Sequence, residues 1–514
     1  METCSLVLLS KSVFTSTEAE PHEGFVAIRG NRIVAVGPAS EAAAYTANAE
    51  RVIDLGSRTV MPGLVDVHTF FTGWMIRSFG ADLSAATTVQ DAADLLAQQE
   101  VAAGDPFIGH NLPADLTTPE AQQAFDAVAP QVPCVAFTAD GGSCLMNTAA
   151  HEAYGFTPDA CYAEMIWKLM PYCLNHPDTR KRYHDYMALL NSRGVTSIKE
   201  MCFDDYYGFA DTMAAMEDAG ELTVRVSMMS QPVGRGADLE YGRAARERFQ
   251  GDFVRFSGYN RMTDRGIGST LGELIEPYKS DPTTTCAVPV EWDLIEAETR
   301  AVDAEGFRYS LHCQGDGAVR HTVALYDTLQ KDEDGKLVNR HAITDLEFSN
   351  PADLDRFGAI GGICEIYPQI QSLDAKQDIV DMVDRQLGLE RMRYYWNRRR
   401  MEDAGITVSC GTDLPLLLPS LGESVYSGVG GYFDDGEYIN RENMLTCAEM
   451  LTAWTAGGAY NCYREDDLGT LEAGKLADIA VLAGDIFATD PKDARDMGVA
   501  LTISDGRIVY EQLD

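Results

Sequence analysis

Runs of alternating apolar and polar residues fill both ends of the chain and predict β-strands joined by tight turns. Residues 24–38 (GFVAIRGNRIVAVGP) contain two such runs around Arg29-Gly30-Asn31, a pattern typical of a hairpin. Near the carboxyl end, residues 477–485 read as one apolar strand, and residues 500–512 (ALTISDGRIVYEQ) as a hairpin that turns at Asp505-Gly506. Since the two ends resemble each other and differ from the centre, we expect one composite β-sandwich domain, built from residues 1–62 and 463–514.

Between these ends, strand-like apolar runs alternate with amphipathic helical segments. The strand-like runs are residues 132–139, 194–201, 221–229, 252–258, 308–315, 342–348, 359–366 and 406–413. Helical segments such as 88–103 and 317–331 lie between them. Repeated β and α units of this length indicate a parallel sheet covered by helices. We therefore predict an α/β fold in which residues 63–462 form a (β/α)8 TIM-type barrel.

Composition and charge narrow the class of protein. The chain has 514 residues, and none of its apolar runs is long enough to cross a membrane. Its first residues lack the basic region and cleavage site of a signal peptide. Its 12 cysteines include no CxxC pair, so we expect reduced thiols and a cytoplasmic location. A formal net charge of −38 disfavours nucleic acid and anionic membranes as partners. The charge does not identify a substrate.

Four polar residues follow strand-like runs, where the active site of a barrel lies. They are His68, His312, Asp345 and Asp413. Side chains of these types suit a divalent ion such as Zn²⁺, which would lower the pKa of a bound water, and Asp413 could take that water's proton. Each residue also has a purely structural interpretation. A histidine at a strand end often forms hydrogen bonds within the protein core, and Asp413 precedes Leu414-Pro415 as a helix N-cap would.

Several stretches resemble the amidohydrolase superfamily. Residues 60–68 (VMPGLVDVH) resemble its opening strand, with the signature Pro-Gly-hydrophobic-hydrophobic-Asp-x-His-x-His, and residues 468–482 and 502–510 resemble its return to the β-sandwich. Residues 312–327, 341–362 and 408–416 are similar to the YtcJ-like branch, which includes N-substituted formamide deformylases. The resemblance implies hydrolysis of a non-peptide carbon–nitrogen bond, one or two divalent metals held on strands 1, 4, 5, 6 and 8, and a homo-oligomer, for which we expect a dimer.

The ligand positions of that family transfer to this chain only in part. His68, His312 and Asp413 match their counterparts, and the strand-6 histidine falls on Asp345. The second histidine of strand 1 falls on Phe70, which cannot bind a metal. The strand-4 lysine, which bridges two metals in many relatives, is expected at Arg255, and arginine cannot form that bridge. A two-metal site is therefore not expected.

Three interpretations of the site remain open. In the first, one divalent metal, with zinc as the first choice, is held by His68, His312, Asp345 and Asp413. In the second, no metal binds, and Arg255 pairs with one of the two aspartates.

In the third interpretation the ligand set is rebuilt, with Lys199 as a carbamylated ligand or Glu200 as a direct one. An ion pair at the barrel rim is the favoured interpretation of Lys199 and Glu200. Aromatic residues near strand ends, Phe70, Trp74 and Tyr259, are expected to line a pocket for a flat substrate, with packing beneath loops as the alternative.

The predicted function is a metal-dependent hydrolase of an amide or formamide-like bond in a small, aromatic substrate. Two alternatives use the same fold. One is a metal-free lyase, hydratase or isomerase in which Asp413, His312 and Arg255 are the catalytic residues. The other is a non-catalytic binder of small molecules, because a fold alone does not establish a reaction.

Overall fold

The computed structural model describes residues 3–102, 104–118, 121–139, 144–154, 169, 172–174, 176–202, 208–231 and 236–513. Contacts divide the chain into two compact units. The first contains Met1–Thr69, Met187–Phe203 and Met216–Asp514; the second contains Phe70–Tyr186 and Asp204–Ala215. The expected boundaries between the β-sandwich domain and the barrel, at residues 62 and 463, both lie within the first unit. They stay a prediction.

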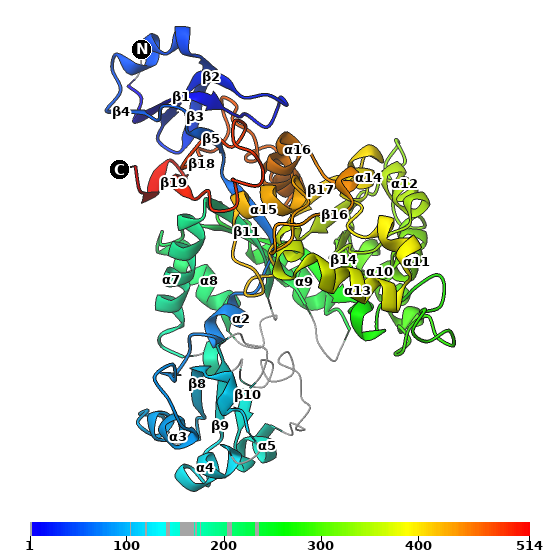
Figure 1. The fold of residues 1–514 in the computed structure, drawn as a ribbon. Coiled ribbons are helices and arrows are strands. Elements are labelled where there is room, and N and C mark those ends of the chain that lie inside the picture. The colour runs from blue at the N-terminus through cyan, green and yellow to red at the C-terminus, as the bar shows by residue number, and fades with distance from the viewer. Residues whose placement is uncertain are drawn as a thin grey trace. The chain divides into compact units, whose positions relative to one another are not determined.

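The predicted barrel is confirmed. Within the described residues, an eight-stranded parallel sheet runs in chain order from β6 to β17 (Figure 1). Its strands are β6 (Leu64–Thr69), β11 (Val195–Cys202), β12 (Arg225–Ser230), β13 (Val254–Met262), β14 (Tyr309–His312), β15 (Ala342–Thr344), β16 (Ile363–Ile366) and β17 (Thr407–Cys410). The intervening helices include α9 (Leu239–Arg248), α10 (Trp292–Ala304), α11 (Asp316–Tyr326), α12 (Pro351–Ala359), α13 (Lys376–Gln386), α14 (Arg398–Asp403) and α15 (Leu421–Gly428).

Asp66 ties the first barrel strand to the last. Its carboxylate accepts hydrogen bonds from the backbone N–H of Thr412 at 3.1 Å and from the hydroxyl of Thr412 at 2.6 Å. It also accepts from the backbone N–H of His68 at 3.2 Å. Burial raises the pKa of Asp66 to about 7, although these bonds oppose the shift. Because Asp66 lies on β6 and Thr412 follows β17, the bonds bring both ends of the sheet together beside His68.

Both chain ends contribute to a second sheet in the same unit, as the alternating patterns predicted. Its strand order is β20-β19-β18-β5-β1-β2-β3, with β4 paired to β1. The amino-terminal strands are β1 (Leu6–Val13), β2 (His22–Arg29), β3 (Arg32–Pro38), β4 (Arg51–Asp54) and β5 (Thr59–Pro62); the carboxyl-terminal ones are β18 (Ile479–Leu482), β19 (Val499–Ser504) and β20 (Arg507–Glu511). Figure 1 shows the blue and red strands together in this sheet. Both predicted hairpins are present, and Asp505 and Gly506 turn the second with φ of 52° and 72°.

A buried ion pair joins the barrel to this terminal sheet. Arg225, at the start of β12, donates two hydrogen bonds to Asp478, which precedes β18, at 2.8 and 3.1 Å. It donates a third bond to Asp505 at 3.0 Å. Both side chains of the main pair are 3% exposed or less. Such a two-pronged pair fixes the relative orientation of the strands that it connects.

The second unit contains a separate sheet that the sequence did not predict. Strands β7 (Ala81–Asp82), β8 (Phe107–Leu112), β9 (Cys134–Thr138) and β10 (Cys144–Met146) pair in the order β10-β9-β8-β7. Helices α3 (Val89–Ala97) and α4 (Ala121–Val128) bury Leu96 and Phe125 in its core. The expectation that residues 132–139 supply a barrel strand is therefore wrong, because β9 pairs with β8 and β10. An apolar run predicts a strand but does not specify its partner.

No helix among the described residues combines the length and the apolar character needed to span a membrane.

We expect Arg225→Met to lower the free energy of unfolding by about 3–5 kcal/mol, because it leaves the buried carboxylate of Asp478 without its cation. Differential scanning calorimetry measures the change. Arg243→Met is the matched control: its ion pair with Glu305 is 49% and 36% exposed, and surface pairs contribute about 1 kcal/mol or less. Equal effects of both variants would contradict a special role for the buried pair.

Candidate active site

The four residues predicted as the site lie at the carboxyl ends of barrel strands. His68 belongs to β6, His312 ends β14, Asp345 follows β15 and Asp413 lies beyond β17. Both aspartates have left-handed backbones, with φ of 61° for Asp345 and 51° for Asp413. Residues other than glycine adopt this conformation rarely, and it often marks functional sites. Burial raises the pKa of Tyr367, and the charges of Asp413 and Asp345 raise it further, so both carboxylates lie near Tyr367 at one end of the barrel.

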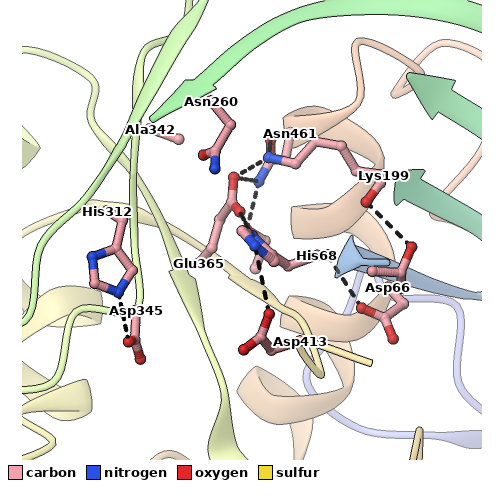
Figure 2. Close-up of polar contacts among 12 residues, drawn as sticks. Asp66, His68, Lys199, Asn260, His312, Ala342, Asp345, Glu365, Asp413 and Asn461 are labelled. Carbon is pink, nitrogen blue, oxygen red and sulfur yellow. Dashed lines mark hydrogen bonds and ion pairs between the residues drawn. The ribbon is translucent and has the colours of Figure 1, made fainter. Parts of the chain in front are cut away.

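These residues form two histidine–aspartate pairs (Figure 2). His312 Nε2 lies 3.0 Å from Asp345 Oδ2, and both side chains are largely buried. His68 Nε2 lies 3.8 Å from Asp413 Oδ1. Asp413 is the most accessible of the four, with its side chain 35% exposed.

His312 carries a positive charge at neutral pH. Burial alone would lower its pKa, but the hydrogen bond to Asp345 and the charges of Asp345, Asp264 and Asp413 outweigh burial and raise the pKa to about 9. Asp264 Oδ1 lies 4.0 Å from His312 Nδ1. The site therefore contains an imidazolium among carboxylates.

The glycine-rich stretch after β14 explains how His312 is held. Backbone N–H groups of Gln314 and Gly315 donate to the buried carboxylate of Asp264 at 2.9 and 2.8 Å. A β-carbon on Gly315 would lie 2.1 Å from the carbonyl oxygen of Glu273, so no larger residue fits there. The close packing of Gly315 against Glu273 allows α11 to begin at Asp316, four residues after His312.

Sequence reasoning missed Glu365, which lies on β16 in the barrel interior. Its Oε2 lies 3.3 Å from His68 Nδ1, and its Oε1 accepts hydrogen bonds from Lys199 Nζ and, at 3.1 Å, from Asn461 Nδ2. Burial favours the neutral acid, but Lys199 and His68 lower the pKa of Glu365 to about 2. The only sequence signal was an acidic residue inside the apolar run 359–366. Lys199 therefore pairs inside the barrel and not at its rim, and Glu200 accepts from Thr69 at 2.8 Å.

Arg255 does not join the site. It lies near the amino end of β13, donates to the carbonyl of Gly251 at 3.0 Å and approaches Asp467 at 3.9 Å. The assignment failed because β13 extends to Met262, so that Arg255 lies near the amino end of the strand and not at its carboxyl end. The predicted Arg255–aspartate pair of a metal-free site is therefore wrong.

The predicted aromatic wall is not assembled by the barrel. Tyr259 is fully buried and donates from its hydroxyl to the carbonyl of Asp238 at 2.6 Å, which fixes it beside α9. Packing beneath neighbouring elements is the correct interpretation of Tyr259. Phe70 and Trp74 lie in the second unit, where the Trp74 ring packs 5.2 Å from that of Tyr186. A substrate contact for Phe70 and Trp74 stays a prediction.

Residues 51–510 match the family described as the amidohydrolase family. The chain belongs to the amidohydrolase family. This amidohydrolase is 23% identical to YtcJ of Bacillus subtilis over 501 residues, which cover 90% of each chain. It is 22% identical to the N-substituted formamide deformylase of Arthrobacter pascens, covering 99% of this chain and 98% of that one.

Among solved structures, an uncharacterized metal-dependent hydrolase from Pyrococcus horikoshii shares the fold, with a TM-score of 0.74. The two are 18% identical, and the match covers 96% of this chain and 99% of that one. The family resemblance predicted from the sequence is confirmed, and family membership makes the protein an enzyme of the hydrolase class.

In the arrangement that the structure gives them, the predicted ligands do not form a metal site. Throughout the described part of the chain, no three His, Cys, Asp or Glu side chains come close enough together to hold an ion. The four predicted ligands are instead divided into two pairs, and in one of them the donor atoms contact each other at 3.0 Å. Phe70 supplies no donor where the family has its second histidine.

We expect Asp345→Asn to lower the pKa of His312 from about 9, because the variant removes the hydrogen bond and charge of Asp345. Titration of ¹³Cε1-labelled histidine by NMR, on protein treated with a chelator, measures the shift. Asp355→Asn is the control, since Asp355 pairs with Arg400 on the surface. An unchanged pKa in Asp345→Asn would show that other groups hold the charge on His312.

Proposed function

We propose that this amidohydrolase cleaves the carbon–nitrogen bond of a small amide or formamide with water. Family membership supports the hydrolase class, and the similar formamide deformylase supports this kind of bond. The observation that carries the proposal is that the positively charged His312, held by Asp345, lies at the same end of the barrel as the pair of His68 and the accessible Asp413. Amide hydrolysis needs a base for water and a positive group for the developing oxyanion.

His68 and Asp413 suit the first role. Their facing atoms are 3.8 Å apart, a separation at which one water molecule can contact both. That water would donate to the carboxylate of Asp413 and to Nε2 of His68. As its oxygen attacks the substrate carbonyl carbon, one proton passes to Asp413, which acts as the general base.

His312 suits the second role. Its imidazolium, oriented by Asp345, would stabilise the negative oxygen of the tetrahedral intermediate. The proton on Asp413 then passes to the leaving nitrogen, and the carbon–nitrogen bond breaks. The products are a carboxylic acid and an amine. Arg255 takes no part, so the lyase or isomerase that was built on Arg255 has no support.

A second version of the same function uses one divalent metal, with zinc as the first choice. The solved neighbour is called a metal-dependent hydrolase, which favours this version. Its donors in this chain would be His68, His312, Asp345 and Asp413. The separation of these residues into two pairs favours the version without metal.

The experiment measures metal content and hydrolysis on the same preparation. Protein purified without chelators is analysed by plasma mass spectrometry and assayed on small amides and formamides, before and after chelation. We expect turnover that survives chelation, and a loss of ~10²–10³-fold in kcat/KM for Asp413→Asn and for His312→Gln. Loss of activity on chelation, restored by zinc, would support the metal version. Absence of turnover on the whole panel would contradict hydrolysis.

A further inference from the structure

An ion pair lies in the barrel interior beside His68, and none of the hydrolytic steps uses it. Lys199 on β11 donates to Glu365 on β16, and both side chains have no exposed surface. Burying two charges is costly, and apolar residues of similar size often replace such pairs without loss of stability. The pair therefore calls for a reason beyond packing, and its contact with His68 supplies one.

The carboxylate of Glu365 determines which nitrogen of His68 carries the proton. Glu365 faces a buried lysine and accepts hydrogen bonds from Lys199 Nζ and, at 3.1 Å, from Asn461 Nδ2. A carboxylate paired in this way with a cation only accepts hydrogen bonds. His68 Nδ1, 3.3 Å from Glu365 Oε2, must then be the donor. The lone pair of neutral His68 is left on Nε2, the nitrogen that faces Asp413.

A second basic side chain, Arg308, lies beside this pair of residues. Asn461 Oδ1 accepts from Lys199 Nζ at 3.3 Å and from Arg308 Nη1 at 2.6 Å. Arg308 is 1% exposed and forms no ion pair within the described residues. Lys199 and Arg308 thus donate to the same amide oxygen, while the amide nitrogen of Asn461 donates to Glu365.

We propose that Lys199 and Glu365 are positioning residues, which hold His68 in the Nδ1–H form. Glu365 orients the ring of His68, so that Nε2 can accept a hydrogen bond from water without a metal ion to fix the ring. The effect on hydrolysis rests on the proposed function. The effect on the ring of His68 does not, and it can be measured without a substrate.

The test replaces both charges at once. Lys199→Met alone would leave Glu365 buried without its cation and could fail to fold. The double variant Lys199→Met/Glu365→Met removes the pair and the acceptor together. The matched control, Arg225→Met/Asp478→Leu, removes another buried ion pair of the same barrel that does not contact His68.

The readout is the ¹⁵N NMR spectrum of histidine-labelled protein, in which the two ring tautomers have distinct shifts. The chain has 9 histidines, and the His68 signal is assigned by its loss in His68→Gln. In the unaltered protein we expect protonated Nδ1 and an unprotonated Nε2. In Lys199→Met/Glu365→Met we expect His68 to change to the Nε2–H form or to a mixture, and in the control no change.

Hydrolysis is measured on the same proteins. We expect kcat of Lys199→Met/Glu365→Met to fall ~10–100-fold with KM nearly unchanged, as when an orienting partner is lost. An Nε2–H ring in the unaltered protein, or an unchanged ring in the folded double variant, would overturn the proposal. A tautomer change without detectable turnover in any protein would sustain the positioning of His68 and contradict the proposed function instead.

Discussion

A carboxylate inside a β-barrel must be matched by donors inside the barrel, because water does not solvate it there. Glu365 imposes this constraint. Lys199, Asn461 and His68, from three separate elements, converge on its two oxygens. Each satisfies part of the buried charge, and in doing so each is fixed in place. The orientation of the ring in the active site thus follows from the need to compensate a charge deeper in the barrel.

Charged groups lie both deep in the barrel and at the carboxyl ends of its strands. Lys199 and Arg308 supply positive charge around Asn461, whereas Asp345 and Asp413 supply negative charge at the carboxyl ends of the strands. His312 compensates part of the latter as an imidazolium. A divalent ion would be another way to balance these carboxylates. Within this chain, His312 supplies the positive charge that lies closest to Asp345.

The sequence predicted most of the fold, because hairpins and buried parallel strands leave periodic patterns that do not depend on distant contacts. It placed four polar residues at strand ends, since each follows an apolar run, and their role in the site stays a prediction: His68, His312, Asp345 and Asp413. It failed where position depended on strand length or on a partner far along the chain. Arg255 was assigned to the site because the end of β13 was placed too early. Lys199 and Glu365 are 166 residues apart, so only the folded barrel could show that they form a pair.

The most direct test of this account is neutron diffraction from crystals of the protein purified without chelators and exchanged into D₂O. The account predicts deuterium on Lys199 Nζ and on His68 Nδ1, none on either oxygen of Glu365, and no scattering centre that joins His68 to Asp413 as a metal would. A deuterium on Glu365, an unprotonated His68 Nδ1, or a metal bound by His68 and Asp413 would contradict it.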